Sequence, residues 1–474
     1  MKRLLLVPTL LGLLFASSAL QAEKPNVLFI FADDMCYEAI RSFGHTDIET
    51  PNLDRMVSSG TTFTHAYNMG SWSGAVCVAS RTMLNTGRFV WEANSVYKNL
   101  EKERTDGRLW TSYLHDAGYD TYFTGKWHVK VDAAKTFKTT AHIRGGMPKQ
   151  TEAGYNRPQA DGTDTWDPAD PKFGGFWEGG THWSEIVGND AVDFLAAAAK
   201  KEDPFFMYIA FNAAHDPRQA PQSYLDRYPL SRIELPKNYL DDYPERKEIG
   251  LPDGQRDERL APHPRSKHAV KVNRREYYAL ITHMDDQIGR ILKALDKSGK
   301  RDNTWIFFTA DHGLGVGHHG LMGKQNMYDH SLRVPFMVIG PGVEKGKKVS
   351  APIYLQDVMP TTLELAGVDK PEHVDFHSIL PIVTGGEKKS VYSSIYGGFL
   401  KFQRAVVADN HKLILYPTIG VKKLYNLKKD PEEMKNIVDT KRGKKITTKL
   451  FAKMLKLQKE TKDEVDLKAA FPDM

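Results

Sequence analysis

Short runs of consecutive apolar residues recur along the chain and end in polar side chains. The runs at 27–31, 204–211, 304–309 and 334–339 are apolar at successive positions, which is the pattern of strands buried on both faces. A further strand is expected at 119–123, and helices are expected at 50–60, 109–117, 190–200, 277–295 and 356–366. Strands that alternate with helices in this way predict an α/β protein.

The pattern changes after residue 390. The segments 404–409 and 412–416 predict a pair of hairpin strands around Asp409-Asn410, and a lysine-rich helix is expected at 447–461. The chain is also longer than a single hydrophobic core usually supports. We therefore expect a large domain at 23–389 and a smaller α+β domain at 390–474.

Two long stretches, 130–183 and 216–271, have no helical or strand period, and loops of this length are usually functional or disordered. Aromatic residues in the first stretch would either stack on sugar rings or anchor the loop to the body of the protein. They are Tyr155, Trp166, Phe173, Phe176, Trp177 and Trp183. Cations in the second stretch would form either a rim for an anionic substrate or a solvated basic face. They are Arg256, Arg259, Arg265, Lys267 and Lys271.

The first 22 residues have the organisation of a secretory signal peptide. Lys2 and Arg3 precede a leucine-rich run up to Leu14, and small residues follow up to Ala22, an arrangement too short and wrongly flanked for a membrane anchor. We expect a signal peptide at 1–22 and a periplasmic or secreted protein with no membrane anchor. Without Lys2 and Arg3 the chain has 63 basic and 59 acidic residues, a balance too mild to indicate nucleic-acid binding.

Polar clusters follow the expected strands. They contain Asp33, Asp34, Lys126, His128, His215, Asp311 and His312. Open α/β sheets bind ligands at the carboxyl ends of their strands, although a solvated loop would also explain the acidic pair on its own.

Cys77 lies in the segment 73–88, SGAVCVASRTMLNTGR. A thiolate nucleophile needs a cation or the positive end of a helix nearby, and Arg81 and a helix opening at 80–84 would supply them. A buried, inert cysteine is the alternative. An oxidising compartment would also allow a disulfide between Cys36 and Cys77, unless Cys77 is chemically modified.

The sequence Cys77-Val78-Ala79-Ser80-Arg81, with Thr-Gly-Arg at 86–88, resembles the signature of type I sulfatases. Ala79 stands where that family usually has proline. The resemblance covers residues 24–340, and 424–427 with Asp430-Pro431 resembles the end of the family. It implies a large mixed sheet sandwiched by helices, as in alkaline phosphatases and sulfatases, with 23–389 as the catalytic domain.

The resemblance also implies the cofactors. A formylglycine-generating maturation enzyme would convert Cys77 to formylglycine (3-oxoalanine), and the site would bind Ca²⁺. The implied metal ligands are Asp33, Asp34, Cys77, Asp311 and His312. The family usually has asparagine at the position of His312, and imidazole is a poor ligand for Ca²⁺.

The catalytic residues that the resemblance implies are Cys77, Arg81, Lys126, His128, His215 and Lys324. Arg81 and Lys126 would hold the hydrate of the aldehyde, and His128 would accept a proton from it. His215 and Lys324 would bind the sulfate group and assist the leaving oxygen, which requires a general acid within hydrogen-bond reach.

The leading hypothesis is therefore a sulfatase, a sulfuric ester hydrolase. The aromatic and basic insertions favour a sulfated polysaccharide or oligosaccharide as substrate. Residues 71–77 and 81–85 look like bacterial sulfatases of marine galactans, which makes the galactose 4-sulfate of carrageenan the first candidate.

Two alternatives come from other classes. A phosphatase or phosphodiesterase of the same fold superfamily would use a two-metal site at Asp311 and His312 that includes His319. A non-catalytic sulfoglycan-binding protein would keep Cys77 as a thiol.

Overall fold

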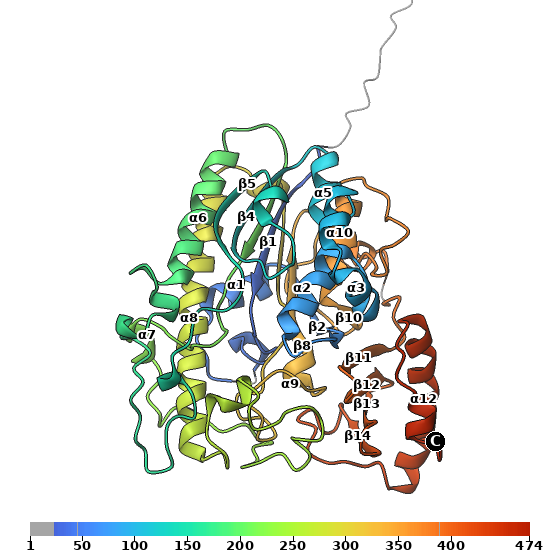
Figure 1. The fold of residues 1–474 in the computed structure, drawn as a ribbon. Coiled ribbons are helices and arrows are strands. Elements are labelled where there is room, and N and C mark those ends of the chain that lie inside the picture. Colours follow the sequence, from blue (N-terminus) through green and yellow to red (C-terminus); the bar gives the residue numbers. More distant parts are fainter. Residues whose placement is uncertain (1–22, 45, 388) are drawn as a thin grey trace, which may run out of the picture.

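A computed structural model describes residues 23–44, 46–387 and 389–474 (Figure 1). The predicted signal peptide at 1–22 lies outside the described residues. Within those residues, none of the helices combines the length and the apolar character needed to span a membrane.

A nine-stranded sheet forms the centre of the protein. Its order is β10-β2-β8-β7-β1-β6-β4-β5, with β9 beside β2. The strands are β1 (Asn26–Ala32), β2 (Thr61–Tyr67), β4 (Asp120–Lys126), β5 (Thr139–Arg144), β6 (Phe205–Ala210), β7 (Thr304–Ala310), β8 (Arg333–Ile339), β9 (Lys347–Val349) and β10 (Ile353–Tyr354). β1 runs parallel to β6 and β7, whereas β8 runs antiparallel to β7 and β2. The predicted α/β fold with a mixed sheet is therefore confirmed.

Helices cover both faces of this sheet, and β1, β6 and β7 are therefore buried along their whole length. One layer contains α1 (Pro51–Ser59), α6 (Trp183–Ala198) and α8 (Lys267–Lys297), and the other contains α2 (Val76–Thr86), α5 (Trp110–Asp116) and α10 (Val358–Leu365) (Figure 1). The shorter helices are α3 (Val90–Tyr97), α4 (Leu100–Thr105), α7 (Gln222–Leu225), α9 (Asp329–Leu332), α11 (Leu380–Val383) and α13 (Leu467–Ala470).

Two helices are longer than their sequence pattern predicts. α8 begins at Lys267 rather than at residue 277. The Ser266 side chain caps this N-terminus by accepting a hydrogen bond from the Ala269 N–H. α6 begins at Trp183 rather than at residue 190, and the His182 side chain caps it in the same way. Lys267 and Lys271, expected on an irregular loop, therefore belong to a helix.

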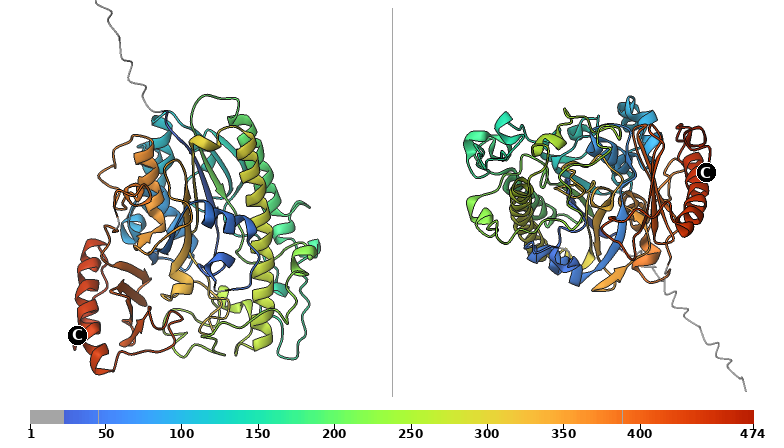
Figure 2. Two further views of the ribbon diagram at one scale, coloured as in Figure 1. Left: turned by 180° about the vertical axis from the view of Figure 1, so that it is seen from behind. Right: turned by 90° about the horizontal axis from the view of Figure 1, so that it is seen from below.

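The C-terminal part forms a second, five-stranded sheet in the order β14-β13-β12-β11-β3 at one side of the large N-terminal part (Figure 2). Its hairpin strands are β11 (Ile395–Phe399), β12 (Gln403–Ala408), β13 (His411–Tyr416) and β14 (Val421–Asn426), and α12 (Lys441–Glu460) packs against them. The predicted hairpin and basic helix are present, while the domain boundary at 389/390 stays a prediction.

The edge strand β3 (Gly70–Ser71) of this second sheet comes from the N-terminal half of the chain. β3 pairs in parallel with β11 and thereby joins the two parts of the protein. Gly70 has a φ of +88°, and a Cβ atom there would lie 2.0 Å from the carbonyl oxygen of Gly398. Only glycine allows this close approach, and the chain leads from it directly to the segment with Cys77.

We expect the substitution Gly70→Ala to lower the free energy of unfolding by about 2–4 kcal/mol, because it combines an unfavourable φ with a backbone clash. Urea unfolding of purified protein measures this change. The matched control is Gly254→Ala, since Gly254 has no atom within 4 Å of a built Cβ and no positive φ. Equal stability of the two variants would contradict the role given to Gly70.

Candidate active site

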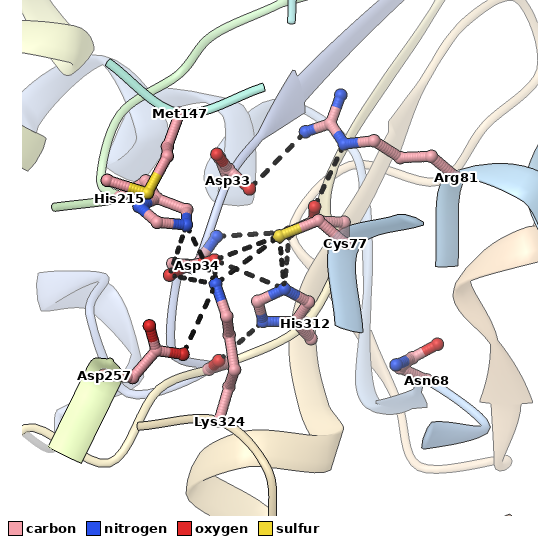
Figure 3. A network of polar contacts seen from close by, with 12 residues as sticks. Asp33, Asp34, Asn68, Cys77, Arg81, Met147, His215, Asp257, His312 and Lys324 are labelled. Carbon is pink, nitrogen blue, oxygen red and sulfur yellow. Dashed lines mark hydrogen bonds and ion pairs between the residues drawn. The ribbon is translucent and has the colours of Figure 1, made fainter. Parts of the chain in front are cut away.

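The carboxyl ends of four neighbouring strands bring the predicted site residues together (Figure 3). Asp33 and Asp34 follow β1, Lys126 ends β4, and His215 comes shortly after β6. Asp311 and His312 directly follow β7. Because β7, β1, β6 and β4 are adjacent and parallel, their ends meet at one edge of the sheet.

Cys77 faces this edge from the first turn of α2. Its side chain is almost completely buried, and its Sγ lies 3.2 Å from His312 Nε2, 3.4 Å from Lys324 Nζ and 3.7 Å from Asp34 Oδ1. Burial alone would raise the pKa of the Cys77 thiol, but the charges of Lys126, Lys324 and His312 hold it well below its ordinary value. Both cysteines are free in the described part of the chain, so the disulfide alternative is not observed.

Arg81 lies one turn further along α2 and contacts carboxylates. Its Nε donates to Asp311 Oδ2 at 3.0 Å, and its Nη2 lies 3.7 Å from Asp33 Oδ1. Its Nη1 donates to the carbonyl oxygen of Lys126 at 2.6 Å. Lys324, whose Nζ lies 3.4 Å from Cys77 Sγ, is therefore the lysine in contact with the thiol, whereas Arg81 contacts the acidic residues next to it.

Two buried lysines pair with the carboxylates of Asp33 and Asp34. Lys126 Nζ pairs with Asp33 Oδ2. Lys324 Nζ lies 2.8 Å from both oxygens of Asp34 and 3.0 Å from His215 Nε2.

A metal ion would fit between the strand ends and Cys77. Ligand atoms of Asp33, Asp34, Cys77 and His312 all lie within 4.8 Å of one another, and all four residues are buried. Asp33 Oδ1 accepts no hydrogen bond from the residues that the structure describes. Burial and the neighbouring charge of Asp311 raise the pKa of Asp33 well above its ordinary value although Lys126 pairs with it, so a bound cation would favour the ionised form of this carboxylate.

His312 presents one ring nitrogen to this cluster. Its Nδ1 lies 2.8 Å from the carbonyl oxygen of Gly313, which can only accept, so Nδ1 carries the proton in the neutral ring. Its Nε2 lies 3.2 Å from Asp34 Oδ1 and 3.5 Å from Asp311 Oδ1. The residue that departs from the family's usual asparagine thus lies where a ligand would be.

A pocket of about 200 Å³ opens above Cys77. Cys77, His128, His215 and Lys324 line it together with the loop residues Gly74, Ala75, Met147, Gln255, Arg256, Asp257 and Gln325. Burial lowers the pKa of His128. Burial would also lower that of His215, but the charges of Asp34 and Asp216 raise it to about 10. The two histidines of the pocket thus favour different protonation states.

The irregular stretch 130–183 lines this pocket with Met147 and not with its buried aromatic rings. Trp166, Phe176 and Trp183 are buried, and none of them is among the described residues that line the pocket at Cys77. The expectation that these three rings form a sugar-stacking surface is therefore wrong, and the anchoring alternative holds. Met147 is the residue of this stretch that reaches the pocket.

The cations of the second stretch also divide. Arg265 is fully buried, and its Nη2 lies 2.5 Å from Glu258 Oε2. The prediction that Arg265 belongs to an exposed rim is therefore wrong. Arg256 lines the pocket, and its Nη2 lies 3.4 Å from His215 Nε2.

The sequence did not predict three polar residues at this site: Asp216, Asp257 and Gln325. Asp216 Oδ1 lies 2.9 Å from His215 Nδ1, and Gln325 Nε2 donates to Asp257 Oδ2 at 2.6 Å. Each of the three directly follows a residue that was singled out, His215, Arg256 or Lys324, and that adjacency was the available signal.

Known proteins resemble this chain over most of its length. The sequence model described as Sulfatase matches residues 25–368, and the model described as N-sulphoglucosamine sulphohydrolase, C-terminal, matches residues 317–460. The uncharacterized sulfatase YidJ of Escherichia coli is 28% identical over 93% of this chain and 88% of its own.

Solved structures share the fold. A structure in complex with D-glucosamine-2-N,6-O-disulfate has a TM-score of 0.72 and 23% identity, covering 93% of this chain and 99% of the other. A structure in complex with a neocarrahexaose has a TM-score of 0.65 and 24% identity, covering 92% of each chain. Since the Sulfatase match covers most of the chain and spans every residue of the site, this protein belongs to the sulfatase family and is a sulfuric ester hydrolase.

Proposed function

We propose that this enzyme hydrolyses sulfate esters of a sulfated polysaccharide or oligosaccharide, using a nucleophile derived from Cys77 and one calcium ion. The observation that carries the proposal is the position of Cys77, which lies between the acidic strand ends and a pocket lined by Lys324, His128 and His215. This arrangement puts a nucleophile, a metal cluster and anion-binding cations around one small space.

Formylglycine fits the position of Cys77. Conversion of the side chain by a maturation enzyme would supply a hydrated aldehyde, and thus a hydroxyl nucleophile with a second hydroxyl beside it. Lys324 Nζ, 3.4 Å from Sγ, can donate a hydrogen bond to an oxygen at this place. Arg81 and Lys126 act through the carboxylates, because Arg81 pairs with Asp311 and Lys126 pairs with Asp33, and these contacts hold both side chains in position.

The remaining residues suit a sulfate ester, which carries one negative charge spread over its oxygens. Lys324 and His215 present adjacent positive charges to the pocket, and charge of this kind stabilises a leaving group as its bond to sulfur breaks. His215 Nε2 would donate a proton to the leaving oxygen, and His128, whose neutral form burial favours, would accept one. Arg256 adds a cation near the leaving-group side.

Calcium would bind the carboxylate oxygens of Asp33 and Asp34. Asp311, whose Oδ1 lies 3.5 Å from His312 Nε2, is the further oxygen ligand that we propose, and the ion bound there would supply positive charge for a sulfate oxygen. His312 adds a nitrogen and the derivative of Cys77 an oxygen. Lys324 favours one ion over two, because its ammonium group occupies the space between Asp34 and His215 that a second ion would need. This arrangement argues against the two-metal phosphatase alternative, as does His319, whose Nε2 lies 3.1 Å from the carbonyl oxygen of Glu433.

The structural neighbours with bound saccharides support a sulfated glycan as substrate. One holds a sulfated glucosamine and another a carrageenan-type hexaose. The galactose 4-sulfate of carrageenan remains the ester that we propose to test first, and a periplasmic or secreted location is the one that we propose for the enzyme.

We expect Cys77→Ser to fold normally but to release sulfate on the order of 10³-fold more slowly or worse, because a serine sulfate ester has no second hydroxyl to expel the sulfate. Initial rates on p-nitrophenyl sulfate measure this loss, and mass spectrometry of the wild-type Cys77 peptide should show the aldehyde in place of the thiol. Cys36→Ala is the matched control and should keep its rate per folded molecule. Turnover by Cys77→Ser near that of wild type would contradict the formylglycine mechanism, and an unconverted thiol in active wild-type enzyme would contradict it too.

We expect saturating CaCl₂ to raise the Tm of chelator-treated wild-type enzyme, since an ion that binds only the folded state stabilises it. Asp311→Ala should abolish both this rise and the activity, because it removes an oxygen ligand and leaves Arg81 without its partner. Differential scanning calorimetry with and without CaCl₂ provides the readout. Asp253→Ala, at an exposed acid far along the chain, should behave like wild type. If chelation and Asp311→Ala both leave activity intact, the metal site is assigned wrongly.

A further inference from the structure

A second hollow lies between the catalytic part and the C-terminal sheet. Its volume is about 740 Å³, whereas the pocket at Cys77 has about 200 Å³. Small-molecule sites usually enclose about 300–1,000 Å³. The pocket at Cys77 is therefore suited to a sulfate group and the atoms next to it, while the hollow is large enough for sugar residues.

Three aromatic rings line the hollow. Trp72 comes from the segment after β3, Trp91 from α3 and Phe402 from the turn between β11 and β12. All three residues are half-buried, and the Arg404 guanidinium lies over the Trp91 ring, 4.7 Å from its centroid, so Trp72 and Phe402 are the rings that the experiment below tests. A flat, partly exposed aromatic ring offers an apolar face with little conformational entropy to lose, which suits the C–H face of a sugar ring.

The charged side chains around the hollow are largely paired. Lys462 Nζ lies 2.9 Å from Glu92 Oε2, and Arg404 Nε lies 2.6 Å from Asp463 Oδ2. This balance differs from the cationic pocket at Cys77. A ligand in the hollow would therefore be bound by stacking and hydrogen bonding rather than by net charge.

The walls of the hollow and of the pocket have no lining residue in common, but they are neighbours along the chain and are linked by hydrogen bonds. Trp72 lines the hollow, and Gly74, two residues later, lines the pocket. On the other side, Gln325 of the pocket donates a hydrogen bond from Nε2 to the backbone carbonyl oxygen of Gly74 at 3.0 Å. The backbone carbonyl oxygen of Gln325 accepts a hydrogen bond from Gln403 Nε2 at 2.8 Å. Gln403 directly follows Phe402 of the hollow.

We propose that this hollow is a carbohydrate-binding subsite for the sugar residues next to the unit whose sulfate enters the pocket at Cys77. The inference rests on the proposed function and adds that the substrate is a glycan of several residues, recognised by its neutral faces as well as by its sulfate. Its contribution to binding should depend little on salt, because screening acts on unpaired charge.

The test compares wild type, Trp72→Ala and Phe402→Ala on substrates of increasing length. The substrates are carrageenan- and heparin-derived oligosaccharides of two, four and six sugar residues, with p-nitrophenyl sulfate as a substrate that fills only the pocket at Cys77. The quantity measured is the kcat/KM for each oligosaccharide divided by that for the aryl sulfate, so any loss of folded protein cancels. Trp177→Ala is the matched control, since Trp177 lines neither the hollow nor the pocket among the described residues.

The wild-type ratio should rise with chain length in at least one series. Trp72→Ala and Phe402→Ala should each lower the ratio for the longer substrates by about 5- to 30-fold, as for the loss of an aromatic anchor, and Trp177→Ala should not. A ratio that is flat with length, or that rises equally in all variants, would overturn the subsite and leave the proposed function in place. Failure of wild type to release sulfate from every substrate would contradict the proposed function itself, and the subsite with it.

Discussion

Three carboxylates, Asp33, Asp34 and Asp311, lie at the strand ends with no exposed surface, and the neutralisation of their charge is the constraint on which the site depends. An unpaired buried carboxylate costs several kcal/mol. Each carboxylate therefore has its own buried cation: Lys126 pairs with Asp33, Lys324 with Asp34 and Arg81 with Asp311. These cations come from β4, from the loop after β7 and from α2, so the electrostatic requirement ties the elements around the site together.

The same balance explains why an anionic substrate is suited to the pocket. Arg81, Lys126 and Lys324 already match the three carboxylates, so a divalent ion bound at the strand ends would give them a net positive charge, and the single negative charge of a sulfate ester would offset part of it. The pocket is small, and its charge recognises the sulfate group rather than the sugar. Discrimination between glycans must then come from surfaces outside it, which is the role that we infer for the larger hollow at the C-terminal sheet.

The sequence predicted the α/β class, the central strands and the polar residues at their ends, because a strand buried on both faces leaves a run of apolar residues that is easy to read. It did not predict that β3 joins the C-terminal sheet, since a strand of two residues, Gly70–Ser71, carries no periodic signal. The irregular stretches were the other limit. Composition identified Trp166 and Arg265 as candidates for the surface, but both are buried. Trp166 packs against Phe173 and Arg157, and Arg265 pairs with Glu258, whereas Arg256 of the second stretch reaches the pocket.

We propose a one-metal sulfatase in which Lys324 Nζ lies between Asp34 and His215, where a second ion would otherwise bind. The most direct measurement is the metal content of the purified enzyme by inductively coupled plasma mass spectrometry, made on a sample whose sulfate release is assayed in parallel. We expect one calcium ion per active chain and no stoichiometric transition metal. Two transition-metal ions per active chain would contradict this proposal, because a second ion at Asp34, His215 and Asp216 would have to displace Lys324 Nζ, which lies 2.8 Å from both oxygens of Asp34.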